Sequence, residues 1–132
     1  MFTQSAVLYD VIHGQRFSAS LAAGSIHTHI QAIKQSAGNA LLDVACGTGA
    51  YLVHLRDRYD VEGLDLDSGM LAEARRKLPD VQLYEADLLN FDLGRQFDVV
   101  LCLGSSIGYV ITTAHLQHAL ATFARHTVPG GV

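Results

Sequence analysis

Apolar residues occur along this chain in two patterns, one typical of amphipathic helices and the other of short buried strands. Helical spacing runs through residues 17–37, where Gly38-Asn39 ends it, and returns at 51–59, 68–78 and after Thr112. Short apolar runs that predict strands lie at 40–45, 61–65, 81–85 and 97–103. The last run is the most apolar, so we expect it in the centre of a sheet.

Capping residues set the expected limits of two of these helices. Asp67-Ser68 is suited to begin the helix at 68–78, and Pro79 ends it. Thr112 or Thr113 is expected to cap the last helix. The apolar face expected on that helix consists of Leu116, Ala119, Leu120 and Phe123.

Strands that alternate with helices predict an α/β fold with a Rossmann-like, doubly wound and mostly parallel sheet. We expect one domain, with residues 1–38 as an N-terminal helical cap segment and 39–132 as the core. A turn at 129–131 is placed to lead into a fifth strand, but the chain ends at Val132. The fold is therefore expected to be truncated after its fourth strand and helix, which leaves an exposed apolar edge.

Composition narrows the possible partners. The 132 residues are 49% hydrophobic and 17% charged, which is typical of a globular chain with a core. The net charge is -4 and no basic stripe is visible, so we expect no nucleic-acid partner. No apolar run reaches the roughly 20 residues that span a membrane, and we expect a cytoplasmic protein. Cys46 and Cys102 are expected to be free thiols, with a disulfide as the less favoured alternative.

The candidate chemistry centres on a glycine-rich turn, LLDVACGTG at 41–49, that joins a strand to a helix. Glycine lets the backbone take a positive φ and approach a ligand closely. Three acids accompany this loop. Asp43 lies within the strand, Asp65 ends the next strand sixteen positions after Gly49, and Asp87 follows the third strand. Ligands of such sheets bind at the carboxyl ends of the strands, so the acids are expected to lie near one ligand.

Each acid has a possible binding role and a plainer alternative. Asp65 can accept both hydroxyls of a ribose, or can be a cap or turn acid. Asp87 can accept from the amino group of an adenine, or can form an Asx turn. A carboxylate buried in a strand, as expected for Asp43, needs partners. A nicotinamide dinucleotide is less favoured, because its G-x-G-x-x-G loop would need glycine where Leu52 stands.

Four segments resemble the successive motifs of class I S-adenosylmethionine (SAM) dependent methyltransferases. They are LLDVACGTG, VEGLDLDSGML, EADLLNF and FDVVLCLGSSIGYV, and the resemblance runs from about Ala6 to the end. The chain is most similar to small-molecule N-methyltransferases, in particular the aminosugar N,N-dimethyltransferases of macrolide biosynthesis. The shared features are VACGTG, the S-S-I-G segment after the fourth strand and an N-terminal L-Y-D.

The resemblance implies a SAM site in residues 39–132, with the N-terminal segment closing over it. Loop backbone would line the methionine end, while Asp65 would hold the ribose and Leu66 would pack on adenine. Asp87 and Leu88 would frame the adenine edge, and Leu103 would line the sulfonium side. The full implied cofactor site is Tyr9, Asp43, Ala45, Gly47, Thr48, Gly49, Asp65, Leu66, Asp87, Leu88 and Leu103. Leu66 and Leu103 can also be plain core residues, and Tyr9 can simply cover the sheet.

The function that follows from the resemblance is methyl transfer to a small-molecule amine or hydroxyl, with an aminosugar amine favoured. Ser105, Ser106 and Tyr109 would face the methyl group, and Tyr109 is the candidate catalytic residue. A phenol, with a pKa near 10, is a poor general base at neutral pH. No metal is expected, and the histidines are expected to be solvated. The alternatives are a non-catalytic interaction module, possible as a homodimer through the sheet edge, and an NAD-binding fragment.

Overall fold

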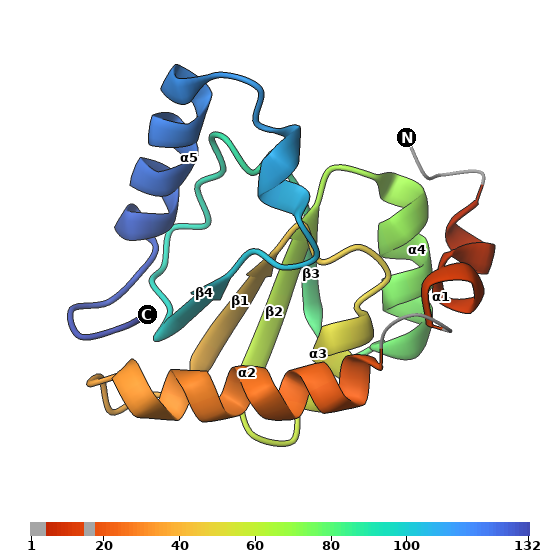
Figure 1. The fold of residues 1–132 in the computed structure, drawn as a ribbon, viewed down its shortest axis with the longest axis horizontal. Coiled ribbons are helices and arrows are strands. Elements are labelled where there is room, and N and C mark those ends of the chain that lie inside the picture. The colour runs from red at the N-terminus through yellow and green to blue at the C-terminus, as the bar shows by residue number, and fades with distance from the viewer. Residues whose placement is uncertain (1–4, 15–17) are drawn as a thin grey trace.

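The computed structural model describes residues 5–14 and 18–132. The elements in chain order are α1 (Ala6–Gly14), α2 (Ala19–Ile33), β1 (Ala40–Val44), α3 (Ala50–Leu55), β2 (Asp60–Asp65), α4 (Ser68–Lys77), β3 (Gln82–Glu85), β4 (Val99–Leu101), the 3-10 helix η1 (Ser106–Tyr109) and α5 (Thr113–Arg125). Figure 1 shows this arrangement, with α2 crossing below the strands and α1 beside α4.

The four strands form one parallel sheet in the order β3-β2-β1-β4. Asp43, one residue before the carboxyl end of β1, lies opposite Gly63 of β2 and Leu101 of β4. The chain order reverses between β1 and β4, so the carboxyl ends of these strands form the switch point at which such sheets bind ligands. The predicted α/β class and parallel sheet are confirmed.

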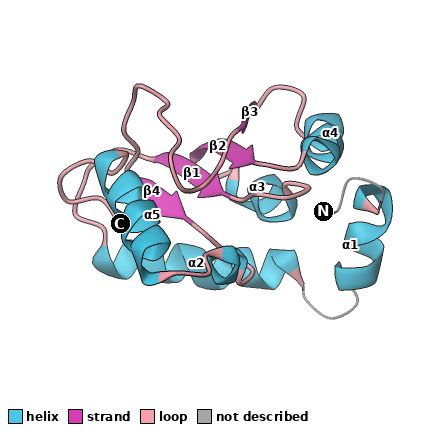
Figure 2. Cartoon of the chain, turned by 90° about the horizontal axis from the view of Figure 1, so that it is seen from above, coloured by secondary structure: helices cyan, strands magenta, loops and turns pink. Residues whose placement is uncertain are grey.

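Alternating strand residues divide the core into two layers. On one face, Leu41 and Val61 pack with buried side chains of α2, α3 and α4. On the other face, Leu42 and Leu64 pack with Phe91, Phe97 and the partly buried Phe123 of α5. Figure 2 shows α2 and α3 along one side of the sheet. Helices on both faces are the doubly wound arrangement that the alternating pattern predicts.

The helices differ from their expected limits at three places. The sequence pattern did not predict α1. The helix expected at 17–37 begins after its N-cap Ser18 and ends at Ile33, while residue 17 lies outside the described residues. The helix expected at 51–59 ends at Leu55. The predicted caps Asp67 and Thr112 are confirmed, since each side chain accepts main-chain N–H groups of the first turn.

The predicted apolar face of α5 is confirmed for Ala119 and Phe123 and is wrong for Leu116 and Leu120. Leu116 and Leu120 are 38% and 53% exposed, whereas Ala119 and Thr122 are fully buried. The Thr122 hydroxyl donates to the carbonyl of Leu89 at 2.9 Å, so the helix is rotated towards the segment before β4. The segment against which α5 packs, and not its apolar pattern alone, therefore decides which side of this helix is buried.

A histidine also contradicts the expectation that the histidines are solvated. His126, which follows α5, is 3% exposed. Its Nδ1 lies 2.7 Å from the carbonyl of Thr122, and its Nε2 accepts the Leu93 amide at 3.1 Å. Nε2 must carry no proton to accept that bond, so Nδ1–H donates to the carbonyl. This neutral ring holds the end of α5 against the segment that precedes β4.

The fourth strand is shorter than expected and occupies a different place. It spans three residues instead of 97–103, and it lies at the edge of the four-stranded sheet, not in the centre. Its outer edge is not bare. The Val100 amide donates to the carbonyl of Val132 at 2.8 Å, and the Val132 amide donates to the carbonyl of Asp98 at 3.0 Å. The final residue of the chain thus covers part of the edge that the sequence left open.

Candidate cofactor site

The glycine loop, residues 45–49, follows β1 at the switch point and contains three left-handed residues. Ala45, Gly47 and Gly49 have φ values of 60°, 56° and 73°. A Cβ built on Gly47 would meet no described atom within 4 Å, so this glycine faces open space. A Cβ on Gly49 would lie 2.9 Å from a methyl carbon of Leu78, so this glycine permits the close packing of α3 on α4. The loop thus presents backbone to a ligand and seats the helix that follows it.

Asp65 connects the ends of two strands. One carboxyl oxygen accepts the Gly47 amide at 2.8 Å, and the other accepts the Asp67 amide at 2.8 Å. The turn-acid alternative therefore describes part of its role. A carboxylate oxygen has two lone-pair positions, so both oxygens can accept one further hydrogen bond each. That is the number that the two hydroxyls of a ribose require.

Asp43 is buried without a partner. The residue is 1% exposed, and neither carboxyl oxygen has a hydrogen-bond partner among the described residues. Burial, followed by the charge of Asp65, raises its pKa to about 8. A buried carboxyl with no donor is costly unless a cation or a hydrogen-bond donor binds beside it. A positively charged or hydrogen-bond-donating group bound where the glycine loop begins would therefore stabilise the Asp43 carboxyl.

The residues expected at the adenine lie after β2 and β3. Asp87 accepts the Leu89 amide at 2.9 Å, which is the Asx-turn alternative. Leu88 is half-buried against the second core layer. Leu66 is 67% exposed, so it is not a core residue and is free to pack on a ligand. Sequence position alone did not separate these cases.

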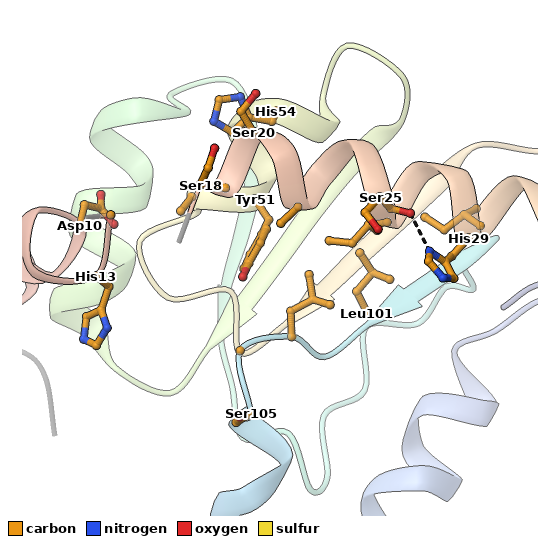
Figure 3. A pocket seen from close by; sticks show the side chains of 18 of the residues that line it. Asp10, His13, Ser18, Ser20, Ser25, His29, Tyr51, His54, Leu101 and Ser105 are labelled. Carbon is orange, nitrogen blue, oxygen red and sulfur yellow. Dashed lines mark hydrogen bonds between the residues drawn. The ribbon is translucent and has the colours of Figure 1, made fainter. Parts of the chain in front are cut away.

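A cavity of about 1430 Å³ lies between α2 and the loop that follows β4. Four of the predicted site residues line it: Tyr9, Leu103, Ser105 and Tyr109. Figure 3 shows Asp10 and His13 at one end, with Tyr51, Leu101 and Ser105 along its length. Burial and the nearby groups Tyr109, Asp10 and Asp65 raise the pKa of Tyr9. Tyr9 is therefore near both the acid after β2 and the loop after β4, and its phenol stays protonated at neutral pH.

Sequence reasoning missed Asp10. Its carboxylate accepts the Thr48 hydroxyl at 2.5 Å and the Lys77 ammonium at 2.5 Å. Asp10 is part of the N-terminal L-Y-D segment shared with the aminosugar methyltransferases, but the resemblance implies a role for Tyr9 alone. Thr48 is 2% exposed, so its hydroxyl points inward to Asp10.

Three further expectations concern metal binding, membrane helices and cysteines. Within residues 5–14 and 18–132, no three histidine, cysteine or acidic side chains gather as a metal would require. None of the helices described here is long and apolar enough to cross a membrane. Cys46 and Cys102 are both free thiols, as predicted.

A parallel sheet with a glycine loop at its switch point and an acid after the second strand defines a class of nucleotide-cofactor enzymes. A family model described as "Methyltransferase domain" matches residues 41–131. The chain belongs to the class I SAM-dependent methyltransferase family, as the sequence motifs predicted, and SAM is the cofactor of that family.

Individual relatives narrow the resemblance to aminosugar enzymes. The chain is 45% identical to a dTDP-3-amino-3,6-dideoxy-alpha-D-glucopyranose N,N-dimethyltransferase from Streptomyces fradiae, with 96% of this chain and 50% of that protein covered. The crystal structure of Streptomyces venezuelae DesVI superimposes with a TM-score of 0.90 at 39% identity, covering 96% and 54%. The structure of a SAM-bound amino pentose methyltransferase from Micromonospora echinaspora superimposes with a TM-score of 0.87 at 39% sequence identity. The match covers 95% of this chain and 53% of that protein. The chain spans about half the length of these relatives.

Proposed function

We propose that this chain is the cofactor-binding part of a methyltransferase that methylates the amine of a nucleotide-linked aminosugar. The observation that carries the proposal is the unpartnered carboxyl of Asp43 at the root of the glycine loop. SAM carries positive charge on its sulfonium and on its α-amino group, and either group could be the partner that the Asp43 carboxyl lacks. The acceptor class is taken from the aminosugar relatives, whose names specify N,N-dimethylation.

The remaining residues fit the rest of this cofactor. The backbone of Ala45, Gly47, Thr48 and Gly49 would line its methionine end, and the free lone pairs of Asp65 would accept the ribose hydroxyls. The exposed Leu66 and the pair Asp87 and Leu88 would contact adenine. In this proposal residues 39–132 bind the cofactor and residues 1–38 cover it.

When bound, SAM supplies a methyl group on a positively charged sulfur, which is itself the leaving group. The residues of this chain then have to position the acceptor and exclude water. Tyr9 has a raised pKa, so its phenol keeps its proton and would serve as a hydrogen-bond donor and not as a general base. Tyr109 and Ser105 line the same cavity, and in this proposal they would orient the acceptor nitrogen. That nitrogen must be unprotonated to attack, and burial in the cavity would lower its pKa and favour the neutral form.

Calorimetric titration with S-adenosylhomocysteine (SAH) tests the proposal, with Asp65→Ala as the variant. Loss of charged hydrogen bonds of roughly 1.5–3 kcal/mol predicts SAH binding at least about tenfold weaker than wild type. Asp60→Ala is the matched control, since Asp60 is an exposed carboxylate at the opposite end of the same strand. Equal binding by both variants would contradict the ribose role.

A parallel calorimetric titration with NAD⁺ distinguishes a methyltransferase from an NAD-binding fragment. Binding of SAH in preference to NAD⁺ supports the methyltransferase proposal, and the reverse supports a dinucleotide-binding fragment. A folded wild-type chain that binds neither would be a non-catalytic module, and the proposed function would be wrong for this chain.

A further inference from the structure

One carboxylate connects the N-terminal helix to the cofactor site. The two oxygens of Asp10 accept separate donors, the Thr48 hydroxyl at 2.5 Å and the Lys77 ammonium at 2.5 Å. Thr48 belongs to the glycine loop and Lys77 ends α4, so Asp10 joins three segments that are distant in sequence. Figure 1 shows α1 beside α4, where this contact is made.

The rest of α1 provides little apolar contact to hold it there. Ala6 is buried, but Val7, Leu8, Val11 and Ile12 are each more than half exposed. A helix of nine residues is marginal in water without tertiary contacts. The polar contacts of Asp10 therefore bear on whether α1 stays docked.

Docking of α1 places two aromatic side chains at the cavity. Tyr9 and His13 stand on either side of Asp10 in sequence, their ring centroids are 4.3 Å apart, and both line the cavity with Tyr109. Figure 3 shows Asp10 and His13 together on α1 at the end of that cavity. A change in the position of this helix moves these two rings and breaks the hydrogen bond that the Thr48 hydroxyl donates to Asp10.

We propose that Asp10 is a positioning residue of the cofactor site, which latches α1 onto the glycine loop and onto α4. This inference rests on the proposed function. Asp10 itself touches Thr48 and Lys77 and acts through them. Since the docked arrangement presents Tyr9 to the ligand, the affinity for the cofactor falls in proportion to the fraction of molecules in which α1 is docked.

The test is SAH titration of the 132-residue chain and of Asp10→Asn, Lys77→Met and the double variant. Asparagine keeps the shape of Asp10 and removes its charge. Because the Lys77 and Asp10 side chains are 21% and 42% exposed, solvent weakens their ion pair, and SAH binding is expected to be about 2- to 10-fold weaker in each single variant. The double variant is expected to be no weaker than Asp10→Asn, because both changes break the same contact. Arg76→Met is the control, since Arg76 is an exposed cation on the same turn that pairs with Glu73.

Salt provides a readout that loss of folding would not reproduce. SAH carries a positive α-amino group and a carboxylate, so salt also screens its own contacts with the protein, and the comparison with Asp10→Asn isolates the contribution of the Asp10–Lys77 pair. Between 50 mM and 500 mM NaCl, wild-type affinity is expected to fall roughly two- to fivefold more than that of Asp10→Asn. Amide exchange of residues 6–14 is expected to slow on addition of SAH in the wild type and not in the variant.

The outcomes separate the two proposals. If Asp65→Ala abolishes SAH binding but Asp10→Asn binds like wild type at every salt concentration, the proposed positioning role of Asp10 is wrong and the proposed function stands. If the wild type does not bind SAH, the proposed function fails, and amide exchange alone decides the latch. Faster exchange of α1 in Asp10→Asn would then support it, and equal exchange would overturn it.

Discussion

The unpartnered carboxyl of Asp43 makes the stability of this chain depend on pH in an unusual direction. A normal aspartate has a pKa of about 3.9, and Asp43 in the folded chain has a pKa of about 8. Between these values the folded state holds a proton that the unfolded state has lost. The stabilising contribution is therefore complete below about pH 4 and is lost as the pH rises through about 8.

The size of this effect follows from the same two values. Between pH 5 and pH 7 the unfolded carboxyl is ionised and the folded one is protonated, so each pH unit costs about 1.4 kcal/mol. We expect the free energy of unfolding to fall by roughly 2–3 kcal/mol over this interval through Asp43. Asp43→Asn has nearly the same shape and cannot ionise, so this part of the pH dependence disappears in the variant.

Urea unfolding followed by circular dichroism at pH 5 and pH 7 measures the difference. Asp43→Asn should exceed the wild type by about 1.5 kcal/mol at pH 5 and by about 4 kcal/mol at pH 7, so the gap between them should widen by roughly 2–3 kcal/mol. Asp60→Asn, at an exposed position of the neighbouring strand, should show no such change. Saturating SAM should flatten the wild-type profile, because a cation near the carboxyl lowers its pKa. An equal offset at both pH values would mean that Asp43 titrates normally, and the reasoning would be refuted.

Two further predictions concern packing and burial. Gly63→Ala is expected to destabilise the chain by about 1–3 kcal/mol in urea unfolding, because the added Cβ would lie 2.8–3.0 Å from three side chains. Gly24→Ala, where a Cβ meets no described atom within 4 Å inside a helix, should instead stabilise by roughly 0.5–1 kcal/mol; equal effects would show that the sheet spacing at Gly63 yields easily. His126→Ala leaves a buried amide and carbonyl unpaired and is expected to cost about 1–3 kcal/mol or more. The exposed His118→Ala is the control and should stay within about 0.5 kcal/mol; a His126 variant that unfolds at the same urea concentration would contradict its role.

Much of the candidate site could be predicted because its parts are local. The glycine loop and Asp65 each follow a strand, and parallel strands bring their carboxyl ends to one edge. That places residues distant in sequence together once the strands are recognised. The roles of Asp65 and Asp87 could not be separated by sequence, because the same side chain can accept a local amide and a ligand.

Other features depended on which surfaces pack together. The apolar pattern of α5 suggested Leu116 and Leu120, yet the buried side carries Thr122, whose hydroxyl finds a carbonyl in the segment before β4. The short α1 has no strong pattern, and its docking rests on Asp10 and on Lys77, 67 positions away. Spacing along a single element contains no information about such a partner.

By itself, the sequence determined the alternation of strands and helices from α2 onwards, the parallel sheet and the glycine loop that follows β1. Those follow from hydrophobic periods of two and 3.6 residues and from glycines that only certain turns require. Only the tertiary structure decided that Asp43 has no partner, that His126 is buried and neutral, and that Asp10 holds α1 to the glycine loop. Those depend on distances between segments far apart in the chain, which packing alone sets.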